Sequence, residues 1–254
     1  MARRRGIHLH ARDLAVLETL AVRRAETLPW LHNQLFAGLS RKRARNRLGD
    51  LVAHGYLTKI TQPDLGEHDH APQRSGAVYL LGPRAPAALK LRSLTGEQLH
   101  GRRALPTLRD TSVPHQLAVN RVGDALGVQL IPEHALELRG VEHRHRPDGA
   151  YRSHPDELGR DLVFVEVDLG HYSRARLLGK LRAFLDHGDA RSILIAAPTE
   201  QRAELIAQWA RERYGNHVMD RVQLFTIAEL HAGARLAPGT EPAGRRPTTT
   251  AATW

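Results

Sequence analysis

The chain has 254 residues, of which 41% are hydrophobic, and a formal net charge of +10. It contains no cysteine, which excludes disulfide bonds and thiolate metal sites. No apolar run approaches the roughly 20 residues needed to cross a bilayer, and no signal peptide is visible, so we expect a cytoplasmic protein without membrane contact. Residues 1–60 hold +8 of the net charge, which predicts a polyanionic partner for this part of the chain.

The first quarter of the chain reads as helical, followed by a ribbon. Apolar residues at helical spacing predict helices over 11–25, 28–37 and 41–54. Two β-prone runs follow at 56–60 and 77–81. Three helices before a two-stranded ribbon is the order of a winged helix-turn-helix, in which the third helix enters the major groove of DNA.

The third predicted helix carries the densest positive charge. Ser40 is a suitable N-cap for it, and Gly55 is well placed to end it. An Arg-rich solvated surface is the plain alternative, but charge and motif order together favour DNA binding. The residues that we expect to contact duplex DNA are Arg41, Lys42, Arg43, Arg45 and Arg47 on this helix and Lys59 on the first ribbon strand.

The segments around the ribbon are rich in turn-forming residues. The polar loop 61–76 contains "GEHDH" at 66–70, which we interpret as a wing tip rather than a metal site. Prolines and glycines over 83–112 predict a connector. We therefore predict a winged-helix domain over 1–82 and a linker over 83–112.

The rest of the chain alternates between helical and strand-like patterns. This order predicts an α/β domain over 113–232, followed by a flexible tail over 233–254. The continuous apolar run at 192–198 is typical of a central parallel strand, and Thr199 can cap the helix after it. The other expected elements are a helix over 114–126, strands at 128–131, 136–140, within 143–151 and at 161–168, a helix over 173–187, and a strand at 222–226.

The strand 161–168 contains two acidic residues in an apolar setting. Its three valines point to one face, whereas Leu162, Phe164, Glu166 and Asp168 point to the other. A buried carboxylate is costly unless it is paired. These two acids therefore require a partner.

Other polar residues can reach the same edge of the predicted sheet. Asp148 ends the preceding strand region, and Lys180 lies on the following helix. Carboxylate oxygens are the ligands that Mg²⁺ or Mn²⁺ prefers, and a nearby lysine can stabilise phosphoryl charge. We predict a metal site from Asp148, Glu166 and Asp168, with Asp148, Glu166 and Lys180 as catalytic residues. The alternative is a metal-free ion network of the two strand acids with Arg144, Arg146 or Arg152.

A family resemblance supports this site. "RPDG" at 146–149 and "FVEVD" at 164–168 resemble the signature motifs of the PD-(D/E)XK nucleases. With "HQLAVNRV" at 115–122, "LLGKLRAF" at 177–184 and the helical head, the chain resembles replication-relaxation proteins of plasmids and mobile elements over about residues 10–190.

The resemblance implies a restriction-endonuclease-like αβββαβ domain after the winged helix, with Asp148 and Glu166 as metal ligands. Active nucleases of this kind usually carry a lysine two residues after the acid, where this chain has Asp168, so Lys180 would replace it from the helix. His115 begins the first helix of that domain and could approach the site, although a capping or surface histidine is the more ordinary interpretation.

These observations lead to three hypotheses. The first is a DNA-binding protein of plasmid replication or relaxation that nicks or cleaves DNA with a divalent metal. The second is a non-catalytic DNA-binding regulator or relaxosome accessory protein whose degenerate nuclease fold serves as a second DNA-contacting surface or as the surface of a homodimer. The third is a winged-helix repressor whose α/β domain senses a small molecule, for which no glycine-rich phosphate loop is visible.

Overall fold

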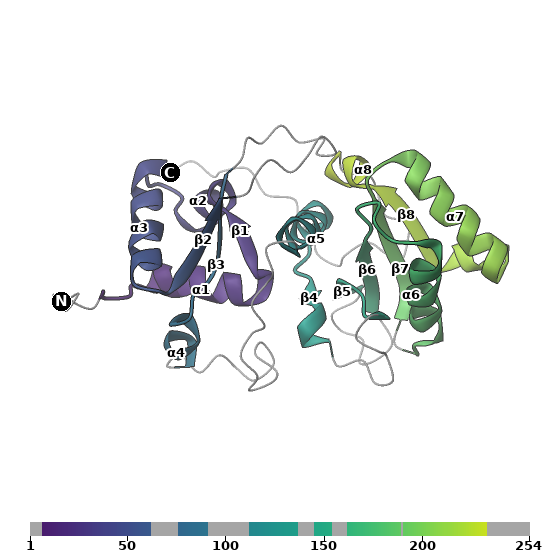
Figure 1. The fold of residues 1–254 in the computed structure, drawn as a ribbon, viewed down its shortest axis with the longest axis horizontal. Helices are drawn as coiled ribbons and strands as arrows, with labels where there is room; N and C mark the ends of the chain where they lie inside the picture. Colours follow the sequence, from purple (N-terminus) through teal and green to yellow (C-terminus); the bar gives the residue numbers. More distant parts are fainter. Residues whose placement is uncertain are drawn as a thin grey trace, which may run out of the picture. The chain divides into compact units, whose positions relative to one another are not determined.

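The structure is a computed structural model that describes residues 7–61, 76–90, 112–136, 145–153, 162–188 and 190–232. The chain divides into two compact units, Met1–Leu117 and Ala118–Trp254 (Figure 1). Both units combine helices with a sheet, which confirms the predicted α/β class. Among the described helices, none has the length and hydropathy that crossing a membrane requires.

The first unit is built from short helices around a three-stranded antiparallel sheet of order β1-β3-β2. Its core is formed by apolar side chains from the helices, including Val16, Leu17, Leu31, Leu48 and Leu51. Its elements are α1 (Ala11–Arg23), β1 (Ala25–Thr27), α2 (Leu28–Leu35), α3 (Arg41–Ala53), β2 (Leu57–Thr61), β3 (Ala77–Leu81) and α4 (Ala85–Lys90).

Three features of this unit differ from the sequence prediction. The first helix ends at Arg23 rather than 25, because Arg24 adopts a φ of 65° and the chain then enters β1. β1 is only three residues long, too short for an alternating pattern, and it pairs with β3 through Glu26 and Tyr79. The segment 83–112 is also not a plain connector, since α4 lies within it and Leu89 reaches the core.

The predicted ends of α3 are confirmed by its backbone. The Ser40 side chain accepts a hydrogen bond from the Arg43 amide at 3.3 Å. Gly55 follows the helix with a φ of +74°. This conformation is costly for residues with a Cβ, and it turns the chain from α3 into β2.

The helix α5 (Val113–Leu126) contains the division between the units. Val113 and Leu117 pack with Val78 and Leu80 of the first unit. From Ala118 onward the helix contributes to the second unit. The predicted domain limits at 82, 112 and 232 stay predictions.

The second unit contains a five-stranded mixed sheet of order β4-β5-β6-β7-β8. β4 to β6 pair antiparallel, and β6 to β8 pair parallel, so the parallel character predicted for 192–198 is confirmed. Its further elements are β4 (Ile131–Pro132), β5 (Gly149–Arg152), β6 (Leu162–Val167), α6 (Arg174–Asp186), β7 (Ala190–Ala197), α7 (Glu200–Tyr214), β8 (Val222–Thr226) and α8 (Ile227–His231), with 3-10 turns η2 (Glu133–Ala135) and η4 (Asn216–Asp220).

Both faces of this sheet are covered by helices, as its apolar strands require. Phe164 of β6 packs with Leu181 of α6 and Ile206 of α7. Val163 and Val165 pack on the opposite face with Val122 of α5. The alternation predicted for β6 is therefore confirmed, and it places Glu166 on the same face as Phe164, toward α6.

One predicted strand of this unit was wrong in its length, and other predicted segments lie outside the described residues. The predicted strand 128–131 is present only as Ile131–Pro132, because Gly127 takes a φ of +68° and the chain turns before it. The segments 66–70, 137–144 and 233–254 lie outside the described residues, and so does most of the predicted strand 136–140.

Candidate functional site

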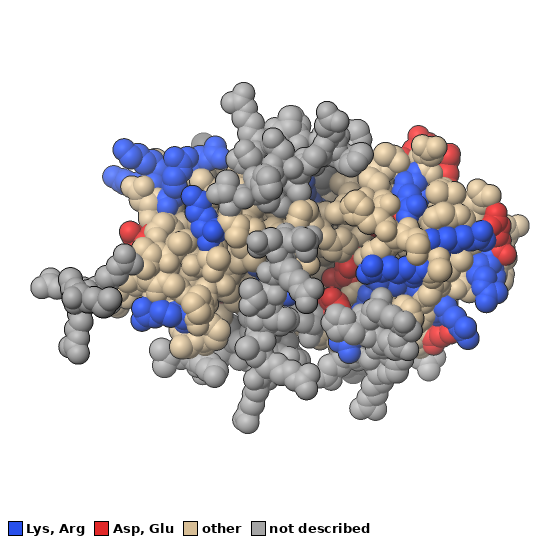
Figure 2. Space-filling view, in the orientation of Figure 1, with Lys and Arg blue, Asp and Glu red and all other residues tan. Residues whose placement is uncertain are grey.

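The basic residues of α3 are divided between two environments. Ala44, Leu48 and Leu51 line its buried side. Figure 2 shows Lys and Arg side chains gathered over this helix, and the exposed ones are Arg41, Lys42, Arg43 and Arg45. Lys59 on β2 is exposed as well. We call these five residues the basic surface.

Charge in the first turn of α3 opposes the helix dipole. Arg41, Lys42 and Arg43 follow the N-cap directly, and the sequence has no acid in this turn. Backbone amides give a helix N-terminus partial positive charge, which favours acids and disfavours cations. The cations therefore do not stabilise the helix, whereas an anion at this end would be attracted by both the side chains and the dipole.

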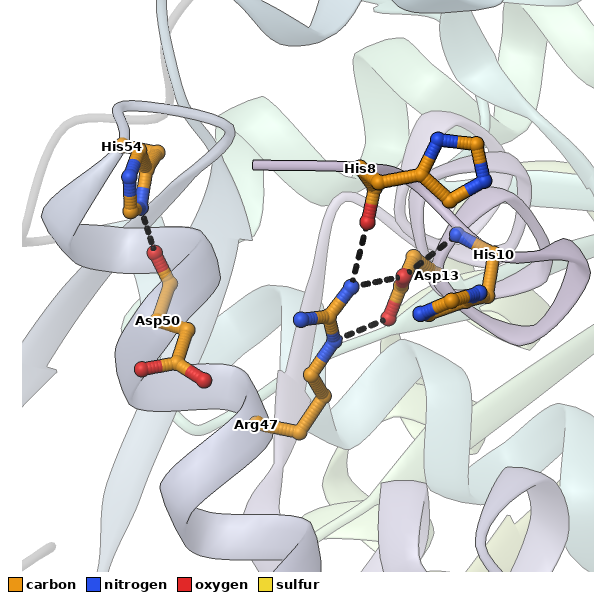
Figure 3. A network of polar contacts seen from close by, with 6 residues as sticks. All are labelled: His8, His10, Asp13, Arg47, Asp50 and His54. Atoms are coloured by element: carbon orange, nitrogen blue, oxygen red, sulfur yellow. Dashed lines mark hydrogen bonds and ion pairs between the residues drawn. The ribbon is translucent and has the colours of Figure 1, made fainter. Parts of the chain in front are cut away.

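Arg47 is on the same helix but does not belong to the basic surface. Its Nε donates to Asp13 Oδ1 at 2.9 Å, and its Nη2 donates to Asp13 Oδ2 at 2.5 Å and to the His8 carbonyl at 2.9 Å (Figure 3). Asp13 also accepts a hydrogen bond from the His10 amide at 2.7 Å, which caps α1. Arg47 thus joins α3 to the start of α1, and its predicted contact with DNA stays a prediction.

The electrostatics of this pair favour the charged forms. Burial alone would raise the pKa of Asp13, but hydrogen bonds from Arg47 and the His10 amide, together with the charge of Arg47, hold it below the usual value of 3.8. The hydrogen bond to Asp13 raises the pKa of Arg47. The pair is therefore ionised throughout the neutral range.

Three of the predicted site residues of the second unit come together. Asp148 precedes β5, and its Oδ2 accepts a hydrogen bond from the Val167 amide at the end of β6, at 2.7 Å. Glu166 is 1% exposed on β6. The Lys180 ammonium lies 2.5 Å from Glu166 Oε1 and 4.0 Å from Asp148 Oδ1. Two carboxylates and one ammonium thus converge where β5 begins and β6 ends.

Asp168 has different partners. It is fully buried, and its Oδ2 accepts a hydrogen bond from Arg202 Nε at 2.7 Å. Its Oδ1 accepts from the Gly170 amide at 2.8 Å. The charge of Asp168 is therefore balanced by α7 and not by Lys180.

The sequence was compared with models of known protein families. The model of the family described as replication-relaxation matches residues 17–190. The chain belongs to the replication-relaxation family. A comparison with curated proteins found no match.

The replication-relaxation match confirms the resemblance inferred from the motifs and supports a replication-related role. The matched range includes α3, Asp148, Glu166 and Lys180, whereas Arg202 lies beyond it. Asp168 lies within the matched range, and its partner Arg202 lies after it.

Sequence reasoning missed two residues beside the carboxylates. Arg202, rather than Arg146 or Arg152, pairs with Asp168, and Arg144 lies outside the described residues. Thr199 caps α7 as predicted, accepting from the Arg202 amide at 3.2 Å, and this cap places Arg202 in the first turn of α7. Because β6 and β7 are parallel neighbours, the start of α7 lies at the edge where β6 ends, which is the signal that could have indicated Arg202.

Tyr172 is the second missed residue. Its ring lies 5.2 Å from the Lys180 ammonium and 4.3 Å from the Arg176 guanidinium. Burial raises the pKa of its phenol, and the carboxylates of Asp148 and Glu166 and a hydrogen bond with Glu166 raise it further. The phenol therefore stays protonated beside the two acids. His115 lies on the first turns of α5, in the first unit as the chain divides.

The carboxylate oxygens at this site are of the ligand type that a hard cation such as Mg²⁺ prefers. Asp148 and Glu166 offer carboxylate oxygens, and Mg²⁺ is often held by only one or two carboxylates together with water and phosphate oxygens. Within the described ranges, no group of three or more His, Cys, Asp or Glu side chains is arranged to hold a metal ion. The predicted three-carboxylate metal site stays a prediction, and in this structure Asp168 pairs with Arg202 rather than joining the other two acids.

Proposed function

We propose that the chain binds duplex DNA through α3 and the β2–β3 ribbon. The observation that carries this proposal is the separation of α3 into a buried apolar side and an exposed side bearing Arg41, Lys42, Arg43 and Arg45. Cations on one helix surface neutralise phosphates and release counterions, which supplies most of the affinity for DNA. Membership of the replication-relaxation family agrees with a DNA partner.

The order of elements in the first unit supports the same function. α1, α2 and α3 are followed by the antiparallel pair β2 and β3. In a winged helix-turn-helix, the helix at the place of α3 enters the major groove and the ribbon flanks it. Lys59 on β2 is exposed and would reach a neighbouring phosphate.

Fluorescence anisotropy with a labelled duplex tests this function. Replacing Arg43 and Arg45 by Gln should weaken binding at least tenfold at moderate salt, because two phosphate or base contacts are lost. The matched control is Arg211→Gln with Arg213→Gln, an exposed pair with the same spacing on α7, which should bind as the wild type does. Equal losses in both variants would reduce the effect to net charge and refute α3 as the DNA-binding helix.

A second candidate function is cleavage of the bound DNA with a divalent metal. The observation that favours it is the convergence of Asp148 and Glu166 on the Lys180 ammonium at the end of β6. Asp148 and Glu166 would hold the ion. Bound Mg²⁺ or Mn²⁺ would supply Lewis-acid charge to the phosphodiester.

The side chains of the chain itself would perform the remaining tasks. Lys180 fixes Glu166 through its hydrogen bond, and another N–H of the ammonium can donate a hydrogen bond to a phosphate oxygen. The Val167 amide fixes Asp148, so its other oxygen, 4.0 Å from Lys180, keeps its direction. The phenol of Tyr172 stays protonated, and its ring lies 5.2 Å from the Lys180 ammonium.

Supercoiled plasmid with Mg²⁺ or Mn²⁺ tests cleavage. The wild type should give open-circular or linear product, and Asp148→Asn should abolish it while duplex binding by anisotropy stays unchanged. If the wild type cuts no plasmid with either ion, cleavage is rejected. The chain would then be a non-catalytic DNA-binding regulator or relaxosome accessory protein, a function that requires only the basic surface.

A further inference from the structure

The turn after β6 is held by both oxygens of Asp168. Oδ1 accepts from the Gly170 amide and Oδ2 accepts from Arg202 Nε. The Asp168 amide donates to the Ala196 carbonyl of β7 at 2.9 Å. Gly170 has a φ of +87°, which allows the chain to reverse there. Asp168 therefore fixes the direction in which the chain leaves the sheet.

Arg202 extends this arrangement to Tyr172. While its Nε donates to Asp168, its Nη2 donates to the Tyr172 carbonyl at 2.7 Å. The guanidinium also lies 5.1 Å from the Trp209 ring on the same helix. A planar guanidinium can serve two acceptors at once in a fixed geometry, which a lysine ammonium cannot reproduce.

Tyr172 in turn contacts the carboxylate site. The Lys180 ammonium lies 5.2 Å and the Arg176 guanidinium 4.3 Å from the centre of its ring, and the Glu166 carboxylate is near enough to raise the pKa of its phenol. A cation beside an aromatic ring is attracted to the face of the ring when solvent is excluded. The ring therefore limits the positions open to the Lys180 side chain.

We propose that Asp168 and Arg202 are positioning residues that hold Tyr172 against Lys180, so that the ammonium stays between Glu166 and Asp148. Asp168 stands where a related nuclease would carry its lysine, and here it anchors the segment that places a lysine from α6. The catalytic meaning of this arrangement rests on the proposed cleavage function. The positioning of Lys180 by Tyr172, Arg202 and Asp168 does not depend on cleavage, because it concerns only where the Lys180 side chain lies.

The small number of lysines makes a direct test possible. The chain has four, namely Lys42, Lys59, Lys90 and Lys180. In protein labelled with ¹³C only at lysine, the ε-methylene signal of Lys180 should be displaced from the other three by the Tyr172 ring. Lys180→Arg assigns the signal by removing it.

Two substitutions test the positioning chain. Tyr172→Leu should move the Lys180 signal to the position of ordinary lysines, whereas Tyr172→Phe should keep it displaced because the ring remains. Arg202→Lys keeps a positive charge for Asp168 but loses the second donor to the Tyr172 carbonyl. It should move the signal as Tyr172→Leu does. An amide spectrum of each variant shows whether it is folded. If Tyr172→Leu is unfolded, the Lys180 signals of Tyr172→Phe and Arg202→Lys are compared instead, and they test the proposal without it.

The control breaks an ion pair between α6, which carries Lys180, and α7, which carries Arg202. Arg174 Nη2 lies 2.8 Å from Glu212 Oε2, and both side chains are exposed. Arg174→Gln should leave the Lys180 signal unchanged. A wild-type signal in folded Arg202→Lys would overturn the proposal, because charge alone would then suffice. Failure of plasmid cleavage together with the expected shifts would reject the nuclease function and leave the positioning role standing.

Discussion

Arg47 of α3 donates hydrogen bonds to both carboxylate oxygens of Asp13, the residue that also caps α1. The two side chains differ in solvent exposure, at 24% for Arg47 and 2% for Asp13. Arg47 can therefore turn to water when its partner is lost, whereas Asp13 cannot. The pair links the helix that we assign to DNA with the first helix of its own unit.

This difference in exposure predicts unequal costs for the two single substitutions. Arg47→Met leaves a buried carboxylate that keeps the His10 amide as a donor but has lost the guanidinium, and it should cost about 3 kcal/mol. Asp13→Asn leaves a guanidinium that can reach solvent, and it should cost about 1 kcal/mol. Hydrogen exchange of the α3 amides measures the stability of this unit. Equal costs would argue against the burial difference.

The lowered pKa of Asp13 predicts a loss of stability in acid. Because the folded-state pKa lies below the usual 3.8, the carboxylate contributes stability that is complete above that value and is lost as the pH falls through the folded pKa. The stability difference between wild type and Asp13→Asn should thus be constant from about pH 7 to about pH 5 and shrink toward about pH 2. Urea unfolding at several pH values measures it, and a difference that grows in acid would contradict the prediction.

The basic surface predicts a defined salt dependence of DNA binding. Each phosphate contact contributes a slope of about −0.9 to the plot of log K against log salt concentration. Replacing Arg41 and Lys42 by Gln should therefore reduce the slope by about 2 in magnitude. The double variant of Arg211 and Arg213 should keep the wild-type slope. Anisotropy titrations over a range of salt concentrations give both values.

Lys180 and Glu166 should be strongly coupled. Lys180→Met leaves Glu166 buried without its 2.5 Å partner and should cost about 3–5 kcal/mol. Glu166→Gln should cost less, because Lys180 retains Asp148 at 4.0 Å. The double variant should be more stable than the sum of the single losses predicts, since neither charge is then left alone. Additive losses in urea unfolding would show that the two side chains act independently.

Two glycines of the first unit predict opposite responses to alanine. A Cβ on Gly49 would meet nothing within 4 Å on the exposed side of α3, so Gly49→Ala should stabilise the unit by up to about 1 kcal/mol. A Cβ on Gly82 would collide with the Gly55 carbonyl oxygen, and backbone atoms cannot move aside cheaply. Gly82→Ala should therefore destabilise the unit by more than about 1 kcal/mol. Thermal unfolding of both variants beside wild type checks the signs.

Local chemistry explains which elements could be predicted from the sequence. Caps, periodicity and apolar runs identified α3, α6 and β7, because each signal lies within the element itself. β1 was not predicted, because a strand of three residues is too short to show an alternating pattern. Its Glu26 is buried through the ion pair with Arg23 at 2.5 Å, and in the sequence alone a glutamate is typical of an exposed helical position.

The candidate site was predictable only in part, for a similar reason. Asp148, Glu166 and Lys180 lie within recognisable motifs, "RPDG", "FVEVD" and "LLGKLRAF". Arg202 lies 34 residues from Asp168, and nothing in its neighbourhood distinguishes it from other arginines. Its role depends on the parallel pairing of β6 with β7, which brings the start of α7 beside the end of β6.

The two outer strands of the second sheet differ in what they offer another chain. β4 has two residues, and one of them, Pro132, lacks an amide hydrogen, so an added strand would find few donors there. β8 has five residues and no proline. If two copies of this protein associate by extending their sheets, β8 is therefore the edge at which a continuous sheet could form.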